Sequence, residues 1–199
     1  MSYFFESFPK VDYDIDKTGK LKTVINPLVR YQFRNFSLYK DRSTVFYDHI
    51  VEEGERPDLT ADRFYGDSTL SWVVLFVNEI VDPLYDWPLD YLDFKNYVSN
   101  KYKYQGSLVN QGGIEWAQAN IHHYEWVYQP ASILFDGTQV KKKFHIVDES
   151  TYNSKTPSER RAVSYYTHED EINADKRNIR ILSQQFLPKL LAEVESIFE

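Results

Sequence analysis

The chain has 199 residues, a formal net charge of −7, no cysteine, and 17% aromatic residues. This length suffices for one sizeable domain, or for a small module with substantial flanking structure. The negative charge argues against a general nucleic-acid-binding role, which needs clustered Lys and Arg, and the lack of cysteine excludes disulfides and thiolate metal sites.

The beginning of the chain, MSYFFESFPK, lacks the basic and apolar segments of an export signal. No stretch approaches the roughly 18 uninterrupted apolar residues that a membrane-spanning helix needs. We therefore expect no membrane partner, and a protein that stays in the cytoplasm or is built into an assembly there.

Residues 1–42 predict an extended N-terminal arm. Residues 3–13 are aromatic and loosely alternating, residues 16–20 have the composition of a turn, and residues 22–27 resume as an extended segment. A lone hairpin is at best marginally stable in water, so such a ribbon needs a surface to lie on.

A strand followed by a short helix comes next. Residues 43–51 (STVFYDHIV) are rich in β-branched and aromatic side chains, which favours a strand. Pro57 suits the first turn of a helix, and Gly66 suits the position just after its end, where φ is positive.

A second helix is expected from the cap at Asp67 to about Ile80, and Pro83 and Pro88 prevent its continuation. This helix is apolar nearly all round, so it must be buried on more than one side. One face carries Leu70, Val73, Val74, Val77 and Val81, and the opposite face carries Trp72, Leu75 and Phe76. We predict that the core and a protein interface of this unit include Leu70, Trp72, Val73, Leu75 and Phe76, with Tyr85 and Trp87 as interface hot spots.

The middle of the chain predicts a helix from about Leu89 that ends before Gly106, and then a β-hairpin. Residues 121–129 (IHHYEWVYQ) have the composition of a strand, residues 136–137 (Asp-Gly) form a strong turn signal, and residues 140–147 (VKKKFHIV) are expected to pair back.

The end of the chain predicts a short strand at residues 178–182 and an amphipathic helix, with Pro188 in its first turn. The packing face of this helix comprises Leu187, Leu190, Leu191, Val194 and Phe198. Strands and helices are segregated along the chain, so the expected class is α+β. We divide the chain into an arm (1–42), a strand–helix–helix domain with its following helix (43–104), and a C-terminal α+β interaction region (105–199).

Candidate catalytic and metal-binding residues are few. His122 and His123 are adjacent in a predicted strand, so we expect their side chains to point to opposite faces and not to share a metal ion. Asp82 and Asp86 could in principle be a carboxylate pair, but a turn or cap role fits Asp82 before proline better. The basic residues 141–143 are expected to be a solvated hairpin face. We predict no enzymatic activity, no cofactor and no metal.

The strand–helix–helix run resembles a LysM module in its residues and their spacing, namely Gly54, Leu59, Tyr65, Gly66, Leu70, Asn78 and Ile80. The segment RPDLTADRFYGDSTLSWVVLFVNEIVDPLYDWP more specifically resembles the LysM-like segment of a family of baseplate wedge proteins from contractile-tailed, T-even-like phages. IHHYEWV (121–127) and EINADKRNIRILSQQFLPKLL (171–191) resemble the middle and C-terminal segments of that family. Together these segments cover well over half of the chain.

The resemblance implies a virion component of the tail baseplate, assembled in the host cytoplasm. Such a protein would bind neighbouring wedge subunits and help to join the wedges around the central hub, with multiple copies in a six-fold assembly. Sheath-initiating and hub proteins are further candidate partners.

Two alternatives stay open. One is a LysM-type module that binds peptidoglycan or other N-acetylglucosamine polymers. The resemblance places the glycan groove beside an exit strand, yet residues 82–88 (DPLYDWP) are poor strand material. The other is a cell-wall hydrolase, which would need two carboxylates converging in a cleft.

Overall fold

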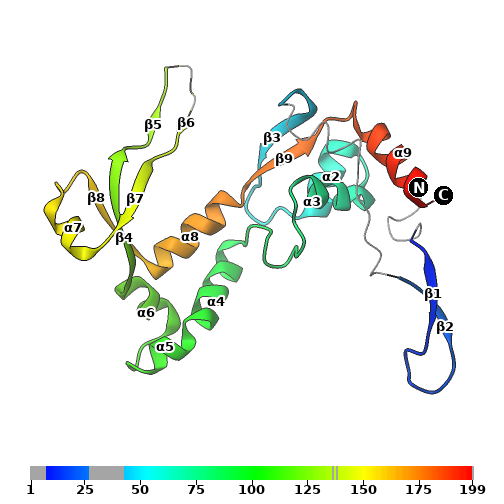
Figure 1. Cartoon of the computed structure of the whole chain (residues 1–199), viewed down its shortest axis with the longest axis horizontal. Helices are drawn as coiled ribbons and strands as arrows, with labels where there is room; N and C mark the ends of the chain where they lie inside the picture. The colour runs from blue at the N-terminus through cyan, green and yellow to red at the C-terminus, as the bar shows by residue number, and fades with distance from the viewer. Residues whose placement is uncertain (1–7, 27–42, 136, 138, 199) are drawn as a thin grey trace. The chain divides into compact units, whose positions relative to one another are not determined.

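The computed structural model describes residues 8–26, 43–135, 137 and 139–198. It contains both helices and strands, which confirms the α+β class (Figure 1). The chain forms two compact units, one from residues up to Trp87 together with the segment from Arg177 onwards, and one from Pro88 to Lys176. This division differs from the three regions expected from the sequence, which stay a prediction. Among the described residues, no helix is long and apolar enough to cross a membrane.

The first unit is built on two strands that are far apart in the sequence. Strand β3 (Phe46–Ile50) follows the short 3-10 helix η2 (Ser43–Val45) and pairs antiparallel with β9 (Asn178–Leu182). The register runs from Phe46 opposite Leu182 to Ile50 opposite Asn178. The predicted strand at residues 178–182 is therefore confirmed, and it belongs beside the strand that precedes the helices.

The two predicted helices connect β3 to the rest of this unit. Helix α2 (Pro57–Tyr65) has proline in its first turn, and it ends at Gly66, which has φ 71° and donates its N–H to the Asp62 carbonyl. The 3-10 helix η3 (Ser68–Leu70) then leads into α3 (Ser71–Val77). Asp67 caps η3 by accepting the N–H of Thr69 at 2.9 Å.

Helix α3 ends earlier than Ile80, the end expected from the sequence. Glu79 has φ 57°, a left-handed conformation that an α-helix cannot contain. Val81 was expected on the buried face, but it is 90% exposed because it lies beyond this break. The buried face is therefore shorter than predicted.

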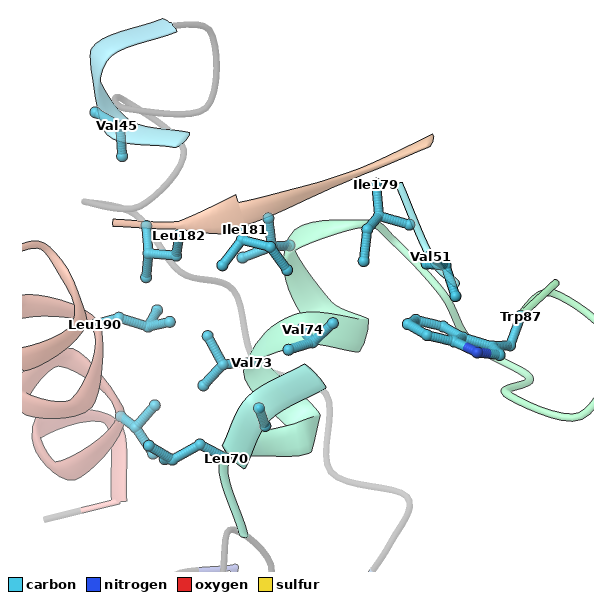
Figure 2. Packing of buried hydrophobic residues seen from close by; sticks show 13 residues of the cluster. Val45, Val51, Leu70, Val73, Val74, Trp87, Ile179, Ile181, Leu182 and Leu190 are labelled. Atoms are coloured by element: carbon cyan, nitrogen blue, oxygen red, sulfur yellow. The ribbon is translucent and has the colours of Figure 1, made fainter. Parts of the chain in front are cut away.

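The cover for α3 comes from the C-terminal segment of the same chain. Strand β9 and helix α9 (Leu187–Phe198), which has Pro188 in its first turn as expected, pack with α3 in one cluster. Figure 2 shows Leu190 of α9 beside Leu182 and Val73. The buried members of this cluster are Val45, Val51, Ala61, Leu70, Val73, Val74, Val77, Trp87, Ile179, Ile181, Leu182, Leu190 and Val194.

The predicted ribbon is present within residues 8–26. Strand β1 (Lys10–Tyr13) pairs antiparallel with β2 (Lys22–Ile25), and Asp14 accepts the N–H groups of Thr18 and Gly19 in the connection. The remainder of the predicted arm, residues 1–7 and 27–42, lies outside the described residues.

The second unit combines helices with a three-stranded antiparallel sheet of order β7-β4-β8. The strands are β4 (Ile121–Gln129), β7 (Lys143–Val147) and β8 (Arg160–Ser164), and β5 (Ser132–Ile133) with β6 (Gln139–Val140) extend the β4–β7 hairpin (Figure 1). The predicted strand at residues 140–147 is thus divided between β6 and β7. The helices are α4 (Tyr91–Lys101), α5 (Lys103–Ser107), α6 (Gly113–Ala119), α7 (Glu149–Ser154) and α8 (Tyr165–Asp175).

A second hydrophobic cluster holds α4, α6 and α8 of this unit together. Its buried members are Phe94, Val98, Tyr102 and Ala117, and Tyr165 and Trp116 pack against them. The helix expected to end before Gly106 instead continues through α5, where Gly106 is buried and its amide donates to the Tyr102 carbonyl. A Cβ at Gly106 would lie 2.7 Å from the Gln111 carbonyl oxygen, so only glycine fits.

Candidate interaction surfaces

The predicted core and interface residues of α3 fall into two groups. Leu70 and Val73 are buried in the cluster of the first unit. Trp72, Leu75 and Phe76 are partly buried and pack against that cluster, so each of these three side chains also keeps some exposed surface. Any interface role of these residues stays a prediction.

The two aromatic residues expected as hot spots differ sharply. Trp87 is only 6% exposed, and its indole N–H donates to the Glu55 carbonyl at 2.8 Å, which fixes the end of the loop that leaves α3 (residues 81–88, the exit loop) to the start of α2. Tyr85 is 62% exposed, and the nearby Leu84 and Val81 are 76% and 90% exposed. The structure places Trp87 in the core and leaves these three side chains, the exit-loop patch, on the surface.

The carboxylates of the exit loop have local roles. Asp82 accepts the N–H of Leu84 at 3.0 Å, and Asp86 accepts the N–H of Asp82 at 3.2 Å. These are the turn contacts expected for an aspartate before proline.

Four of the five residues predicted as the packing face of the C-terminal helix lie in or against the cluster of the first unit. Leu190 and Val194 are buried, and Leu187 and Leu191 are partly buried against the same cluster. The side chain of Phe198 lies outside those that the structure describes.

The β1–β2 ribbon exposes large apolar side chains along its length. Both strands are almost entirely exposed, and two strands alone are marginally stable in water. The exposed apolar side chains, which we call the ribbon patch, are Val11 and Tyr13 on one face of the strands, Ile25 on the other face, and Ile15 and Leu21 in the connection. The alternation of residues 3–13 indicated a ribbon in the sequence, but Ile15 and Leu21 had no signal of their own.

A second apolar projection lies at the end of the β5–β6 extension. Ile133 is 73% exposed, Leu134 is 50% exposed and Phe135 is fully exposed. Adjacent exposed apolar side chains at a hairpin end are typical of contact sites, whereas single ones are ordinary. The sequence showed the turn here but gave no reason to single out these three residues, which we call the hairpin tip.

A buried carboxylate in the second unit lies close to several basic side chains. Glu125 on β4 has a side chain only 1% exposed, and Lys142 donates to it at 2.8 Å, with Arg161 at 3.5 Å and His123 at 3.4 Å. Lys142 was expected to be solvated, but it satisfies this buried charge instead. His123, Glu125 and Lys142 border a cavity of about 920 Å³ lined by residues of β4, β5, β7 and α8.

The two adjacent histidines do not point to opposite faces. The register of β4 against β8 shifts between Ile121 and His123, so the strand contains a bulge at His122. Nδ1 of His122 lies 2.8 Å from Nδ1 of His123, and one nitrogen of His168 joins them, with all three ligand atoms within 4.8 Å of one another. The expectation that the two side chains point to opposite faces was wrong, because a bulge breaks the alternation on which it depended.

Two further buried carboxylates have pKa values set by competing effects. Burial favours a raised pKa at Glu55, but donors from the Glu52 backbone, His49 and Thr60 outweigh it and lower the pKa. Glu169 on α8 is similar, because donors from Lys101 and Tyr102, both at 2.7 Å, lower its pKa despite burial. Both groups are therefore charged at neutral pH and bind parts of their own units together.

Comparison with known proteins gives one consistent result. Residues 3–194 match the family model described as Base plate wedge protein 53. The chain is 26% identical over 121 residues to the baseplate wedge protein gp53 of Enterobacteria phage T4, in an alignment that covers 59% of this chain and 56% of that protein. The chain thus spans a little over half of the length of this curated relative.

Proposed function

Because the chain belongs to the base plate wedge protein 53 family, and so has a structural role in the baseplate of a phage tail, we propose that it binds neighbouring wedge subunits through apolar side chains that its folded units leave exposed. The observation that carries this proposal is the ribbon patch on β1 and β2. A two-stranded ribbon buries too little surface to be stable by itself, so its apolar side chains gain most when another protein covers them.

Two other patches support the same reading. The hairpin tip and the exit-loop patch each expose three large apolar side chains within a segment of at most five residues. Contact with another subunit would remove this surface from water, and aromatic residues such as Tyr13, Tyr85 and Phe135 are the types enriched at the centres of interfaces. In this proposal the protein helps to join wedges around the hub, in multiple copies of a six-fold assembly that forms in the host cytoplasm, without enzymatic activity.

Co-purification with the other wedge subunits tests the proposal. The double variant Tyr13→Ser with Leu21→Ser should fold as the wild type, because both side chains are exposed, but should lose most of its retention by the wedge subunits. The matched control is Leu92→Ser, which removes a side chain 69% exposed on α4. Sheath-initiating and hub proteins, tested as separate baits, identify which component the ribbon patch contacts.

Retention of the double variant at the wild-type level by every bait would exclude the ribbon patch as an interface. The same test on Phe135→Ser then decides whether the hairpin tip is the contact. If neither variant loses binding to any baseplate component, the proposal that exposed apolar side chains make these contacts is wrong.

A second candidate function, glycan binding, gains support from one observation. Strand β9 pairs with β3, so the first unit has the order strand, helix, helix, strand around α2 and α3. In this second proposal the unit is LysM-like, and β9 takes the place of the exit strand that residues 82–88 do not form. Sedimentation with insoluble peptidoglycan and chitin tests this function, and absence of the protein from the pellet would remove it.

A further inference from the structure

We propose that His122, His123 and His168 form a binding site for a divalent transition-metal ion of the Zn²⁺ type. Each imidazole offers one nitrogen, and these three nitrogens lie within 4.8 Å of one another. Neutral imidazole is among the commonest ligands for Zn²⁺, and three protein ligands with one open position are a recurrent arrangement. The site does not depend on the partner contacts proposed above.

The fold brings these residues together through one irregularity and one tight connection. The bulge in β4 puts His122 and His123 on the same side of the strand. Strand β8, which pairs with β4, ends at Ser164, and α8 begins at the next residue. Ser164 caps α8 by accepting the N–H of Thr167 at 3.1 Å, which places His168 in the beginning of the helix beside the bulge.

The present arrangement needs only small adjustments to hold an ion. At Zn–N distances of 2.0–2.1 Å, tetrahedral ligand nitrogens lie about 3.3 Å apart. The Nδ1 atoms of His122 and His123 are 2.8 Å apart, so they would separate slightly as the ion replaces their hydrogen bond. The rings of His122 and His168 are stacked at 4.0 Å with an interplanar angle of 13°, so one ring must tilt about χ2, a torsion with a broad energy minimum in histidine.

The surroundings of His123 provide a second, independent indication. Its other nitrogen, Nε2, lies 3.4 Å from Glu125, a carboxylate whose side chain is 1% exposed. Metal-binding histidines almost always donate their second N–H to a carboxylate or carbonyl, which fixes the tautomer and directs the free lone pair at the ion. Glu125 is itself held in place by Lys142 at 2.8 Å. Glu125 therefore lies beside one nitrogen of His123, and the other nitrogen, Nδ1, faces His122.

Access to the cluster also suits a metal. His123 and His168 border the cavity of about 920 Å³, which gives an ion and a fourth ligand a route to the nitrogens. Since β4 and α8 both contribute ligands, a bound ion would stabilise the sheet–helix contact of the second unit.

The test is titration of the metal-stripped full chain, free of any histidine tag, with ZnCl₂ by calorimetry, alongside the absorption spectrum with Co²⁺. We expect one equivalent bound, an intense visible Co²⁺ spectrum indicating tetrahedral nitrogen ligation, and a higher melting temperature with Zn²⁺. His168→Gln should weaken binding at least about 10-fold, since loss of a ligand should cost no less than loss of its supporting partner. The matched control is His145→Gln, an exposed histidine of β7 outside the cluster, which should bind Zn²⁺ as the wild type does.

Two results would overturn the proposal. One is the absence of Zn²⁺ binding and of a tetrahedral Co²⁺ spectrum in the wild type. The other is equal binding by the wild type and the cluster variants. If His168→Gln does not fold, His122→Gln replaces it, because the His122 side chain is exposed and its loss leaves the cores intact.

Discussion

The side-chain amide of Asn78 pairs with both backbone groups of Arg180, a residue 102 positions later in the chain. Nδ2 of Asn78 donates to the Arg180 carbonyl and Oδ1 accepts the Arg180 N–H, each at 2.8 Å. Nδ2 also donates to the Val74 carbonyl at 2.8 Å, so the same amide ends α3 and binds β9. The Asn78 amide thus forms the two backbone hydrogen bonds to β9 that a residue of a neighbouring strand would form.

Replacing Asn78 should therefore loosen the first unit. Asn78→Ala leaves the N–H and carbonyl of Arg180 without this partner, which should cost about 2–4 kcal/mol in the free energy of unfolding of this unit. Hydrogen exchange of the β3 and β9 amides measures that loss directly. The control is Gln185→Ala, which removes an exposed amide side chain from the same unit. It should change the opening free energy measured by exchange by less than about 0.5 kcal/mol.

Asn173 makes the same kind of contact in the second unit. Its Oδ1 accepts the N–H of Leu89 at 2.8 Å and its Nδ2 donates to the Leu89 carbonyl at 3.0 Å. We expect Asn173→Ala to lower the opening free energy measured by hydrogen exchange at the α4 and α8 amides, again by about 2–4 kcal/mol. The β3 and β9 amides should keep their protection. Asn78→Ala should give the opposite pattern. A uniform loss across both units in either variant would show that they unfold together and not as two units.

The C-terminal strand should be as important to the first core as α3 is. Ile181 is completely buried in the cluster that packs β9 against α3 and α9, so Ile181→Ala should lower the free energy of unfolding by about 2–5 kcal/mol. Ile146→Ala makes the same chemical change at a side chain 69% exposed on β7, and it should have little effect. Denaturant unfolding compares the two. Similar small effects would contradict the placement of β9 in this core.

The sequence predicted the local elements of both units better than their partners. Helical spacing and the Pro57 and Gly66 signals correctly predicted α2, and the alternation of Ile179 and Ile181 predicted β9 with its buried face. The pairing of β3 with β9 could not be predicted, because hydrophobic patterns report which face is buried and not what covers it. The apolar residues around the second helix did indicate that another segment packs on it, and β9 and α9 of the same chain do so.

The histidine cluster shows a different limit. Period-2 alternation is the only rule available for neighbouring residues in a strand, and it separates His122 from His123. The bulge at His122 breaks this alternation. The bulge depends on the pairing register of β4 with β8, which no local sequence signal specifies. His168 has no feature in the sequence that connects it with the other two.

Acid should destabilise the first unit through Glu55. Its pKa is lowered from 4.5 in the folded state because three donors bind the carboxylate, so its contribution to stability is fully present above about pH 4.5. That contribution is lost as the pH falls through the lower folded-state pKa, since the unfolded chain then binds the proton more readily. Glu55→Gln cannot take up this proton, so its free energy of unfolding should fall less steeply between about pH 5 and pH 3 than that of the wild type.

The measurement is a series of denaturant unfolding curves at several pH values for both proteins. Glu169 has a lowered pKa as well and contributes in the same direction, so the difference between the two proteins, and not the wild-type slope, isolates Glu55. Glu195→Gln removes an equal charge from an exposed position on α9 and should follow the wild-type slope. If Glu55→Gln also follows the wild-type slope, the hydrogen bonds from Glu52, His49 and Thr60 do not favour the carboxylate, because a preference for the charged form must appear as a dependence of stability on pH.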